Sequence, residues 1–158
     1  MNGPAAHVTQ LVLFRLDQQR YALPLTVVER VVRAVEVTPL PNAPAIVLGA
    51  INVHGRVLPV LNIRRRFLLP DREICPADWF LVADMGRRTV VLVVDESDGV
   101  VERPHTDIVS SAQIGPGLEH FPGVVKLDDG LVVIHDLERF LSLDEARALD
   151  TALDTRGA

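Results

Sequence analysis

The sequence predicts a mainly β fold in which short strands close into small barrels. Valine-rich aliphatic runs alternate with turn signals over most of the chain, and valine favours strands. Roughly nine or ten short strands can be counted, with few helices and no regular alternation of strand and helix. Closure into barrels removes the exposed edges that so many apolar strands would otherwise present. The 158 residues suffice for one globular domain, or for two very small ones that share a core.

The N-terminal third predicts a hairpin, a short helix and a proline-rich loop. The apolar run Leu11 to Leu16 and the segment YALPL (21–25) flank a polar turn at 18–20. Thr26 followed by Glu29 has the spacing of a capping box, which predicts a short helix near Val27. Three prolines interrupt the next segment, VEVTPLPNAP (35–44), and this favours an edge strand that runs into a loop.

Two apolar runs, Ile46 to Val53 and Arg56 to Ile63, predict a second hairpin with His54 and Gly55 at its tip. Pro59 cannot donate a backbone hydrogen bond, so we expect its strand at a sheet edge or at a bulge. The following RRRFLLP (64–70) is typical of a helical turn that exposes its arginines to solvent.

The middle of the chain predicts a loop followed by one more hairpin. Residues 71–78 are polar and contain proline, so they predict the loop. DWFLVAD (78–84) and TVVLVVD (89–95) predict the two arms of the hairpin, with a turn between them. The second arm is continuously apolar, which is typical of a strand buried on both faces. DESDG (95–99) reads locally as a further turn.

The C-terminal third predicts loop, hairpin and helix. Glycines and prolines mark 102–123 as loop, whereas VVKL (124–127) and LVVI (131–134) flank Asp129 and Gly130 as a hairpin with a tight turn. Asp136 caps a predicted short helix that ends at Leu141. Ser142 and Glu145 repeat the capping-box spacing, and the helix expected after them carries one apolar face made by Leu143, Ala146, Leu149 and Leu153.

Composition argues against several classes of protein. The formal charge of −5 disfavours a surface built to bind nucleic acid. Cys75 is the single cysteine, so the chain has no internal disulfide and no paired-cysteine metal site, which fits a reducing compartment. Neither a signal peptide nor an apolar run of the roughly 18 residues that span a bilayer is present, and we expect a cytoplasmic protein without membrane insertion.

Groups that could carry chemistry are scattered. The five histidines show no metal-binding spacing, and we expect no metal, cofactor or catalytic residue; they are His7, His54, His105, His120 and His135. His135 and Asp136 with Ser110 or Ser111 leave a small hydrolase as a remote alternative. The acidic cluster of Asp95, Glu96 and Asp98 is interpreted as solvated turn carboxylates.

The arginine run Arg64 to Arg66 allows two interpretations. A solvated helix face or a contact with an acidic protein partner is favoured, because Arg56 and Arg72 are the only other cations nearby in the sequence. A nucleic-acid-binding barrel, which would need aromatic side chains beside the cations, stays as another remote alternative. Trp79 and Cys75 are interpreted as packing residues.

Four spaced segments resemble the CheW family, the adaptor proteins that couple bacterial chemoreceptors to the CheA histidine kinase. The segments are LVLFRLDQQRYALPLTVVERV, PLPNAPAIVLGAINVHGRVLPVLNIRRRF, VVLVVDESDGV and GVVKLDDGLVVIHDLERFL. The resemblance covers about residues 10 to 142 in the family's order. It implies a CheW-like domain of two SH3-like five-stranded barrels that share an apolar core, after a flexible N-terminus (1–9) and before a C-terminal helix and tail (143–158). It also implies that VDESDGV is extended and not a turn.

The resemblance further implies a non-enzymatic scaffold with two protein partners: the regulatory domain of a CheA-type kinase and the cytoplasmic signalling tip of a chemoreceptor. Recruitment to membrane-associated receptor arrays follows from those partners. Carried over by position, the receptor-binding residues are Val28, Arg30, Gly49, Asn52, His54 and Gly55.

Two of these positions depart from the family pattern. His54 replaces the arginine of the family's Asn-Leu-Arg-Gly motif, and Arg30 stands where an acidic residue is common. Histidine is shorter than arginine and only partly cationic near pH 7. An adaptor of a specialised array, one that controls pilus motility, surface sensing or a second messenger, is therefore the alternative within the family.

Overall fold

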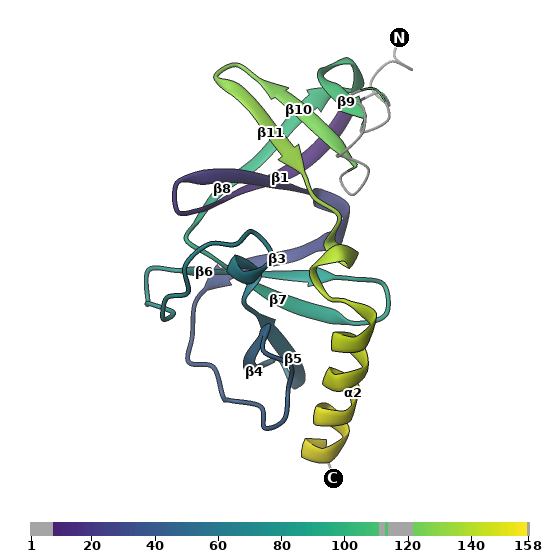
Figure 1. The fold of residues 1–158 in the computed structure, drawn as a ribbon. Helices are drawn as coiled ribbons and strands as arrows, with labels where there is room; N and C mark the ends of the chain where they lie inside the picture. The colour runs from purple at the N-terminus through teal and green to yellow at the C-terminus, as the bar shows by residue number, and fades with distance from the viewer. Residues whose placement is uncertain (1–7, 111–112, 114–121, 158) are drawn as a thin grey trace.

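A computed structural model describes residues 8–110, 113 and 122–157 of the chain, and Figure 1 shows two β-sheets stacked end to end. The sheet that lies uppermost in Figure 1 has the strand order β8-β1-β2-β11-β10-β9. We call it the upper barrel. Its strands are β1 (Val8–Leu16), β2 (Gln19–Pro24), β8 (Glu96–Pro104), β9 (Ile108–Ser110), β10 (Gly123–Leu127) and β11 (Gly130–Ile134).

The second sheet, which we call the lower barrel, has the order β3-β6-β7-β5-β4. Its strands are β3 (Val28–Arg33), β4 (Val47–Val53), β5 (Arg56–Leu61), β6 (Trp79–Asp84) and β7 (Thr89–Val94). The chain passes from the upper to the lower barrel after β2 and returns after β7. The barrels are therefore interleaved in sequence and do not form consecutive domains.

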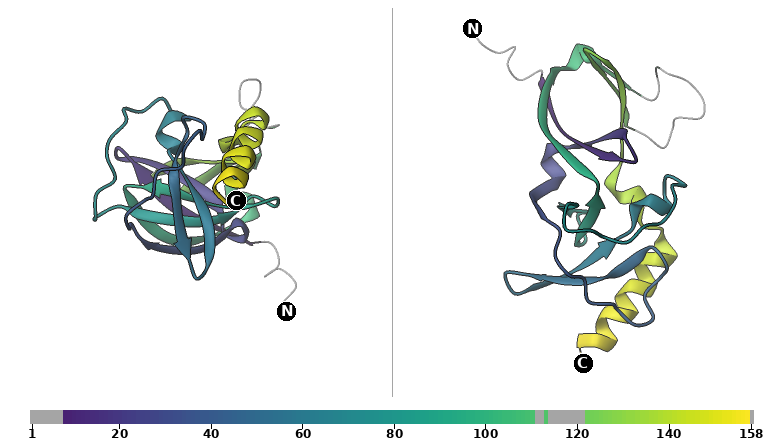
Figure 2. Two further views of the ribbon diagram at one scale, coloured as in Figure 1. Left: turned by 90° about the horizontal axis from the view of Figure 1, so that it is seen from below. Right: turned by 90° about the vertical axis from the view of Figure 1, so that its left-hand side faces the viewer.

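Each sheet curls toward closure through its outermost strands. In the upper barrel β8 and β9 lie at opposite ends of the sheet, yet only the 3-10 turn η4 (His105–Asp107) separates them along the chain. They act as one bent strand, so the barrel has five strands in effect, and Figure 2 shows its ring in the right-hand view. In the lower barrel the chain beyond β3 returns to β4, where Thr38 and Ala50 form a two-way backbone bridge (3.0 and 2.8 Å). The predicted mainly β fold of two five-stranded barrels is confirmed.

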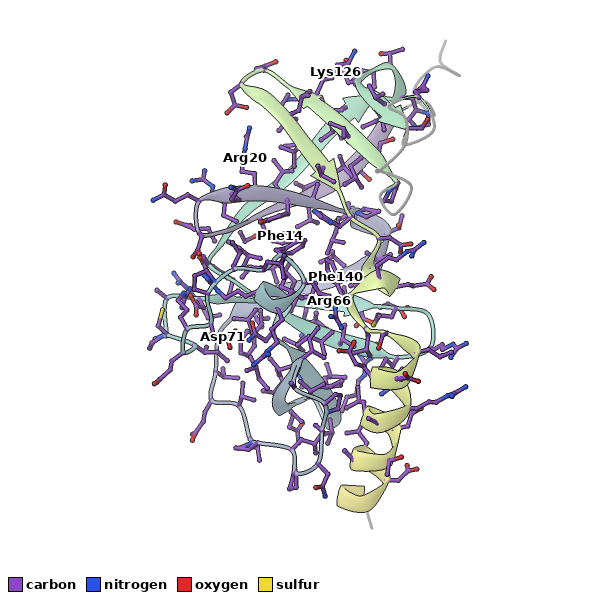
Figure 3. The ribbon with its side chains drawn as sticks, in the orientation of Figure 1. Phe14, Arg20, Arg66, Asp71, Lys126 and Phe140 are labelled. Carbon is purple, nitrogen blue, oxygen red and sulfur yellow. The ribbon has the colours of Figure 1, made fainter. Side chains whose placement is uncertain are left out.

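Three apolar clusters fill the molecule. One cluster lies inside the upper barrel and includes Leu11 and Val125, and a second lies inside the lower barrel and includes Phe80 and Val91. The third and largest, which we call the inter-barrel core, draws residues from both barrels and from the C-terminal segment. Phe14 belongs to it and lies between the two sheets in Figure 3. Because this core joins the barrels, each barrel buries part of its apolar surface against the other.

The C-terminal helix α2 (Leu143–Gly157) packs along the lower barrel, as Figures 1 and 2 show. The predicted capping box is confirmed: Glu145 N–H donates to Ser142 Oγ (3.1 Å), and Ser142 N–H donates to Glu145 Oε1 (2.8 Å). The apolar face differs slightly from the expected one, because Leu143 is exposed whereas Ala152 is buried with Leu149. None of the helices in the described part of the chain has the length and apolar character needed to cross a membrane.

Several predicted elements are confirmed. The three later hairpins, β4–β5, β6–β7 and β10–β11, form as expected, and the loop at 71–78 contains no strand. The first hairpin also forms, with its turn at Asp17 and Gln18, both at positive φ. The short helix capped by Asp136 is the 3-10 segment η5 (Leu137–Phe140), in which Asp136 Oδ1 accepts from Glu138 N–H.

Other predictions are wrong, and each has a physical reason. The helix expected near Val27 is a single 3-10 turn, η2 (Leu25–Val27), after which β3 begins. The side chain of Glu29 bonds Arg56 and Thr89 across the barrel and does not cap a helix. The β-branched residues that follow prefer the strand. DESDG lies in extended β8 as the family resemblance implied, so the local turn reading is wrong.

The arrangement around 35–44 and Pro59 is also corrected. The expected edge strand shrinks to the single bridge at Thr38. Pro59 lies in β5, which is not an edge strand but sits between β4 and β7. Its missing N–H is tolerated because the pairing of β5 with β7 includes only Val60 and Leu61. Of the predicted loop 102–123, the structure places 102–104 in β8 and 108–110 in β9, while 111–112 and 114–121 lie outside the described residues. The same is true of residues 1–7 of the predicted N-terminal tail.

Candidate functional site

The tip of the β4–β5 hairpin brings three of the predicted receptor-binding residues into one turn. His54 and Gly55 occupy its two central positions at φ +51° and +86°, the geometry of a tight hairpin turn. Asn52 Oδ1 accepts a hydrogen bond from Gly55 N–H (2.8 Å), so this side chain fixes the turn from within. The conformation of the tip is therefore fixed by its own hydrogen bond.

Strand β3 lies beside this tip and supplies two further predicted residues. The side chains of Arg30 and His54 meet, with Nη1 and Nε2 3.0 Å apart. One residue earlier, Glu29 pairs with Arg56 at the base of the tip (3.2 Å). Val28 is half-buried against the inter-barrel core and pairs with Ala83 of β6. The structure thus groups Arg30, Asn52, His54 and Gly55 around one corner of the lower barrel, which we call the β3–tip corner, whereas Val28 precedes it on β3 and faces the inter-barrel core.

Gly49 has a different environment from the other five residues. A Cβ atom at this position would lie 2.2 Å from the carbonyl oxygen of Thr38 and 2.7 Å from Val37 Cγ1. The neighbouring residue Ala50 forms the bridge to Thr38. Glycine is therefore required here for closure of the lower barrel, whether or not a partner also approaches it.

Gly49→Ala is expected to lower the free energy of unfolding by about 2–3 kcal/mol, because the new methyl group collides with backbone that cannot move without breaking the bridge at Thr38. Gly99→Ala is the matched control: its φ is +86°, but nothing lies within 4 Å of the new Cβ, so only the backbone strain of about 1 kcal/mol applies. Urea unfolding of both variants gives the comparison. Equal losses would contradict the packing role of Gly49.

The prediction that the run Arg64 to Arg66 forms a solvated helix face is wrong for Arg64. The Arg64 side chain is buried and pairs with Asp17 (2.8 Å) and Asp95 (2.7 Å). Arg65 pairs with Asp71, and Arg66 pairs with Glu145 of α2. The acids that neutralise the run lie within the chain itself, so the run provides no basic patch for nucleic acid.

Arg64 belongs to a five-residue network, Asp17, Arg64, Arg72, Asp78 and Asp95, which we call the polar clamp. Asp17 lies in the β1–β2 turn of the upper barrel, whereas Arg64 lies in η3 (Ile63–Arg65) beside the lower barrel. Arg72 extends the network from Asp95 to buried Asp78 (2.6 Å). The clamp therefore ties the two barrels together on the polar side of the inter-barrel core, and it revises the view of Asp95 as a solvated turn residue.

The clamp also sets the charge state of its carboxylates. Burial alone would raise the pKa of Asp78, but hydrogen bonds from Arg72 and from the backbone and thiol of Cys75 outweigh it and hold the pKa below its usual range. The pKa of Asp95 is lowered in the same way: burial opposes ionisation, while the Asp17 N–H, Arg64 and Arg72 together favour it more strongly. Both groups stay ionised at neutral pH.

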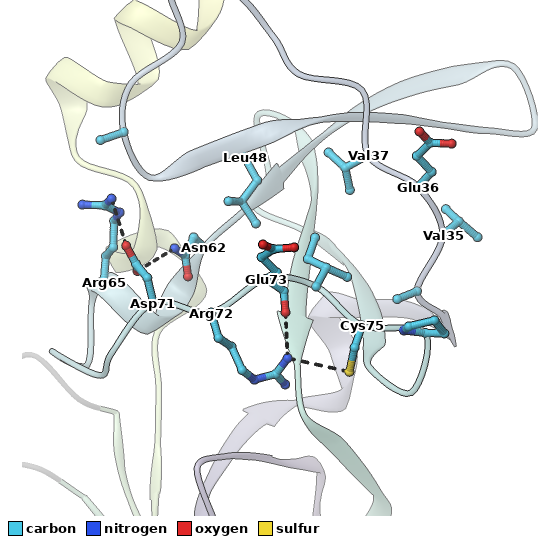
Figure 4. A pocket seen from close by; sticks show the side chains of 14 residues that line it. Val35, Glu36, Val37, Leu48, Asn62, Arg65, Asp71, Arg72, Glu73 and Cys75 are labelled. Atoms are coloured by element: carbon cyan, nitrogen blue, oxygen red, sulfur yellow. Dashed lines mark hydrogen bonds and ion pairs between the residues drawn. The ribbon is translucent and has the colours of Figure 1, made fainter.

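An open groove of about 870 Å³ lies on the lower barrel between the 34–37 segment and the 71–76 loop (Figure 4). Leu48 projects between its walls, and Val35 and Leu48 are exposed apolar side chains. On one wall Asp71 accepts hydrogen bonds from Asn62 (3.0 Å) and Arg65 (3.2 Å). Apolar contacts beside hydrogen-bonded polar groups suit contact with another macromolecule.

The residues proposed for hydrolysis have structural roles in this fold. His135 is buried, and its ring contacts those of Tyr21, Phe67 and Phe140. The Asp136 carboxylate accepts from Glu138 N–H (3.1 Å) and lies 4.0 Å from Arg139, as a helix cap does. Ser110 Oγ contacts Gln113, and Ser111 lies outside the described residues. These contacts give the remote hydrolase alternative no support.

Burial lowers the pKa of His135 from 6.5 to about 4. The unfolded chain therefore binds a proton between these values and the folded chain does not, so stability is lost as the pH falls from 6.5 to 4. At roughly 1.4 kcal/mol for each pH unit, the loss from this residue reaches about 3 kcal/mol at pH 4. We expect His135→Phe to remove most of this pH dependence, as measured by urea unfolding at pH 7, 5.5 and 4. An unchanged dependence in the variant would contradict the assignment.

The remaining histidines show no common site. Among the residues that the structure describes, no group of three or more His, Cys, Asp or Glu side chains could hold a metal ion. His7 and His120 lie outside those residues. Cys75 is exposed, and its thiol donates to Asp78 (3.4 Å), which revises its reading as a packing residue. Trp79 packs against the inter-barrel core, and Arg33 stacks on its ring (4.1 Å).

Sequence reasoning missed the Arg30 and His54 contact, the polar clamp and the groove. Each joins segments that are far apart in the sequence, and the relevant strand registers cannot be read from one sequence. A weak signal existed for the clamp, because Arg64 directly follows the apolar run that ends at Ile63.

Comparisons with known proteins agree on one family. The family model of the CheW-like domain matches residues 10–145. Protein FrzA of Myxococcus xanthus is 31% identical over 135 residues, 85% of this chain and 84% of the relative. Chemotaxis protein CheW of Treponema pallidum is 27% identical over 146 residues, 89% of this chain and 86% of the relative. The crystal structure of the scaffolding protein TtCheW from Thermoanaerobacter tengcongensis has the same fold, with a TM-score of 0.76 and 24% identity over 87% of this chain and 94% of that one.

Proposed function

The chain belongs to the family of CheW-like domains, and on that premise we propose that it is a non-enzymatic adaptor that couples chemoreceptors to a CheA-type histidine kinase. The observation that carries the proposal is the family match over residues 10–145, which spans both barrels and the inter-barrel core. The surfaces described above support it, because the groove and the β3–tip corner offer contact area without a constellation of reactive groups. The protein acts by binding and transforms no substrate.

For the receptor, we propose that its helical signalling tip contacts the β3–tip corner. Arg30, Asn52, His54 and Gly55 lie together there, Val28 precedes Arg30 on β3, and the Asn52 side chain holds the turn. A preformed surface loses little conformational freedom when it binds. Gly49 takes part by keeping β4 closed against the Thr38 segment.

We propose that the protein binds the regulatory domain of the kinase and the receptor tip at the same time. Simultaneous binding lets receptor motion bias kinase activity, because the two sites are coupled through one rigid body. The polar clamp and the inter-barrel core give that body its rigidity. The protein then resides in the cytoplasm and joins the membrane through receptor arrays.

Pull-down with the full-length protein tests the proposal. Its baits are a CheA-type kinase and the cytoplasmic signalling fragment of a chemoreceptor, both from the same organism. Retention by each bait is the expected result. Binding to neither would overturn the proposed function.

A specialised array is the second candidate, and Arg30 and His54 favour it because both depart from the common family pattern. The choice of array depends on which receptor the corner accepts. If the departures select a partner, His54→Arg should change affinity for the cognate receptor fragment. Unchanged affinity would show that His54 carries no partner preference.

A further inference from the structure

Arg30 differs from most of the other arginines of the lower barrel in its contacts. Six of them pair with a carboxylate of this chain: Arg56 with Glu29, Arg64 with Asp95, Arg65 with Asp71, Arg66 with Glu145, Arg72 with Asp78 and Arg88 with Asp150. Arg33 stacks on Trp79. Within the described part of the chain Arg30, Arg33 and Arg87 make no ion pair, and the side chain of Arg30 hydrogen-bonds with that of His54.

The Arg30 and His54 contact concentrates hydrogen-bond donors. A guanidinium has five N–H donors and no acceptor, so the imidazole accepts through Nε2 and carries its proton on Nδ1. This contact engages Nη1 of Arg30 and leaves most of the guanidinium donors directed elsewhere. Both side chains are exposed, on a chain with a formal charge of −5. The pair is thus a locally cationic spot to which none of the described carboxylates is paired.

The position of the pair is fixed by the surrounding structure. Arg30 pairs with Val82 in the β3–β6 ladder, and His54 sits in the turn locked by Asn52. The neighbouring Glu29 is already engaged by Arg56 and Thr89. Among the described residues no carboxylate pairs with Arg30, so its guanidinium is available to an acidic group of a partner.

We propose that Arg30 and His54 form a recognition site for a carboxylate on the receptor's signalling tip; this inference rests on the proposed function and names the chemistry of its receptor contact. A planar guanidinium binds a carboxylate through two parallel N–H donors, and the adjacent imidazole limits the side-chain positions of Arg30 before binding. Arg30 carries the charge and is therefore the main determinant of carboxylate binding, whereas His54 positions the Arg30 side chain. An acidic side chain is accordingly the partner group that distinguishes the cognate receptor.

Binding measurements on the full-length protein test the inference, with a soluble cytoplasmic chemoreceptor fragment from the same organism as the probe. We expect Arg30→Glu to weaken binding by about tenfold or more and Arg30→Gln by less. Arg103→Glu makes the same change of charge on β8 of the upper barrel and should stay within about twofold of the wild type. Wild-type affinity should also fall more steeply with salt than that of Arg30→Gln.

A reciprocal exchange identifies the carboxylate. Acidic residues of the receptor fragment are changed to lysine one at a time, and one change should weaken the wild type yet restore binding to Arg30→Glu. Thermal unfolding of each variant checks that the fold is retained. If the wild type binds and Arg30→Glu binds equally well, or if no lysine substitution restores binding, the inference is overturned while the proposed function stands. If the wild type binds no receptor fragment, the inference and the proposed function are both contradicted.

Discussion

Phe14→Ala is expected to lower the free energy of unfolding by about 3–5 kcal/mol, which is the largest loss that we predict for a single substitution. Phe14 is fully buried in the inter-barrel core, and its ring stacks on Tyr21 with centroids 5.6 Å apart. Removal of the ring leaves a cavity between two stiff sheets that cannot collapse around it. Urea unfolding followed by circular dichroism measures the loss.

The same experiment tests whether the barrels are one cooperative unit. Since the inter-barrel core draws on both barrels and on α2, Phe14→Ala should shift a single transition and should not split it. Val100→Ala, at an exposed position of β8, serves as the control and should cost less than about 1 kcal/mol. Two separated transitions in the wild type would contradict the shared core.

Arg64→Met is expected to cost about 2–3 kcal/mol at pH 7. The substitution keeps much of the side-chain volume but leaves the Asp17 and Asp95 carboxylates close together without the cation between them. Loss of one partner from a buried ion pair is costly because the remaining charge stays poorly solvated. Here the carboxylates are partly exposed, with 40% of the Asp17 side chain accessible, so we place the loss below that of a fully buried pair.

Arg65→Met provides the matched control for this prediction. Arg65 is the next residue, and it forms an exposed pair with Asp71, so its loss should stay within about 0.5 kcal/mol. The deficit of Arg64→Met should also shrink as the pH falls and Asp95 becomes protonated, because the lowered pKa of Asp95 in the wild type derives in part from Arg64. Equal losses for the two variants would show that the polar clamp contributes nothing beyond a surface pair.

Local sequence patterns predicted the hairpins correctly. They gave wrong predictions where contacts between distant segments determine the local structure. The turn at His54 and Gly55 could be recognised, and both residues take a positive φ. The turn predicted at Asp129 and Gly130 is formed one residue earlier, by Asp128 and Asp129, and Gly130 begins β11. The Thr26 and Glu29 spacing suggested a helix cap, yet Glu29 finds Arg56 and Thr89 on other strands. No local pattern reveals those partners.

The candidate site was likewise predictable only in part. The corner residues could be named by family resemblance, and the structure brings four of the six together at β3 and the β4–β5 turn. The contact between Arg30 and His54 could not be predicted from the sequence, because it depends on how the lower barrel closes. Gly49 could be interpreted as a turn residue or a partner contact, and only the folded structure reveals the approach of the Thr38 carbonyl.

Receptor control of kinase activity in a reconstituted system tests the central claim most directly. The assay compares autophosphorylation of the CheA-type kinase with receptor-containing membranes, in the presence and in the absence of the full-length protein. We predict that the receptor alters kinase activity only when the protein is present, and that receptor ligand reverses the change. Kinase activity that is indifferent to the protein, in a mixture where receptor and kinase are each active, would contradict the account.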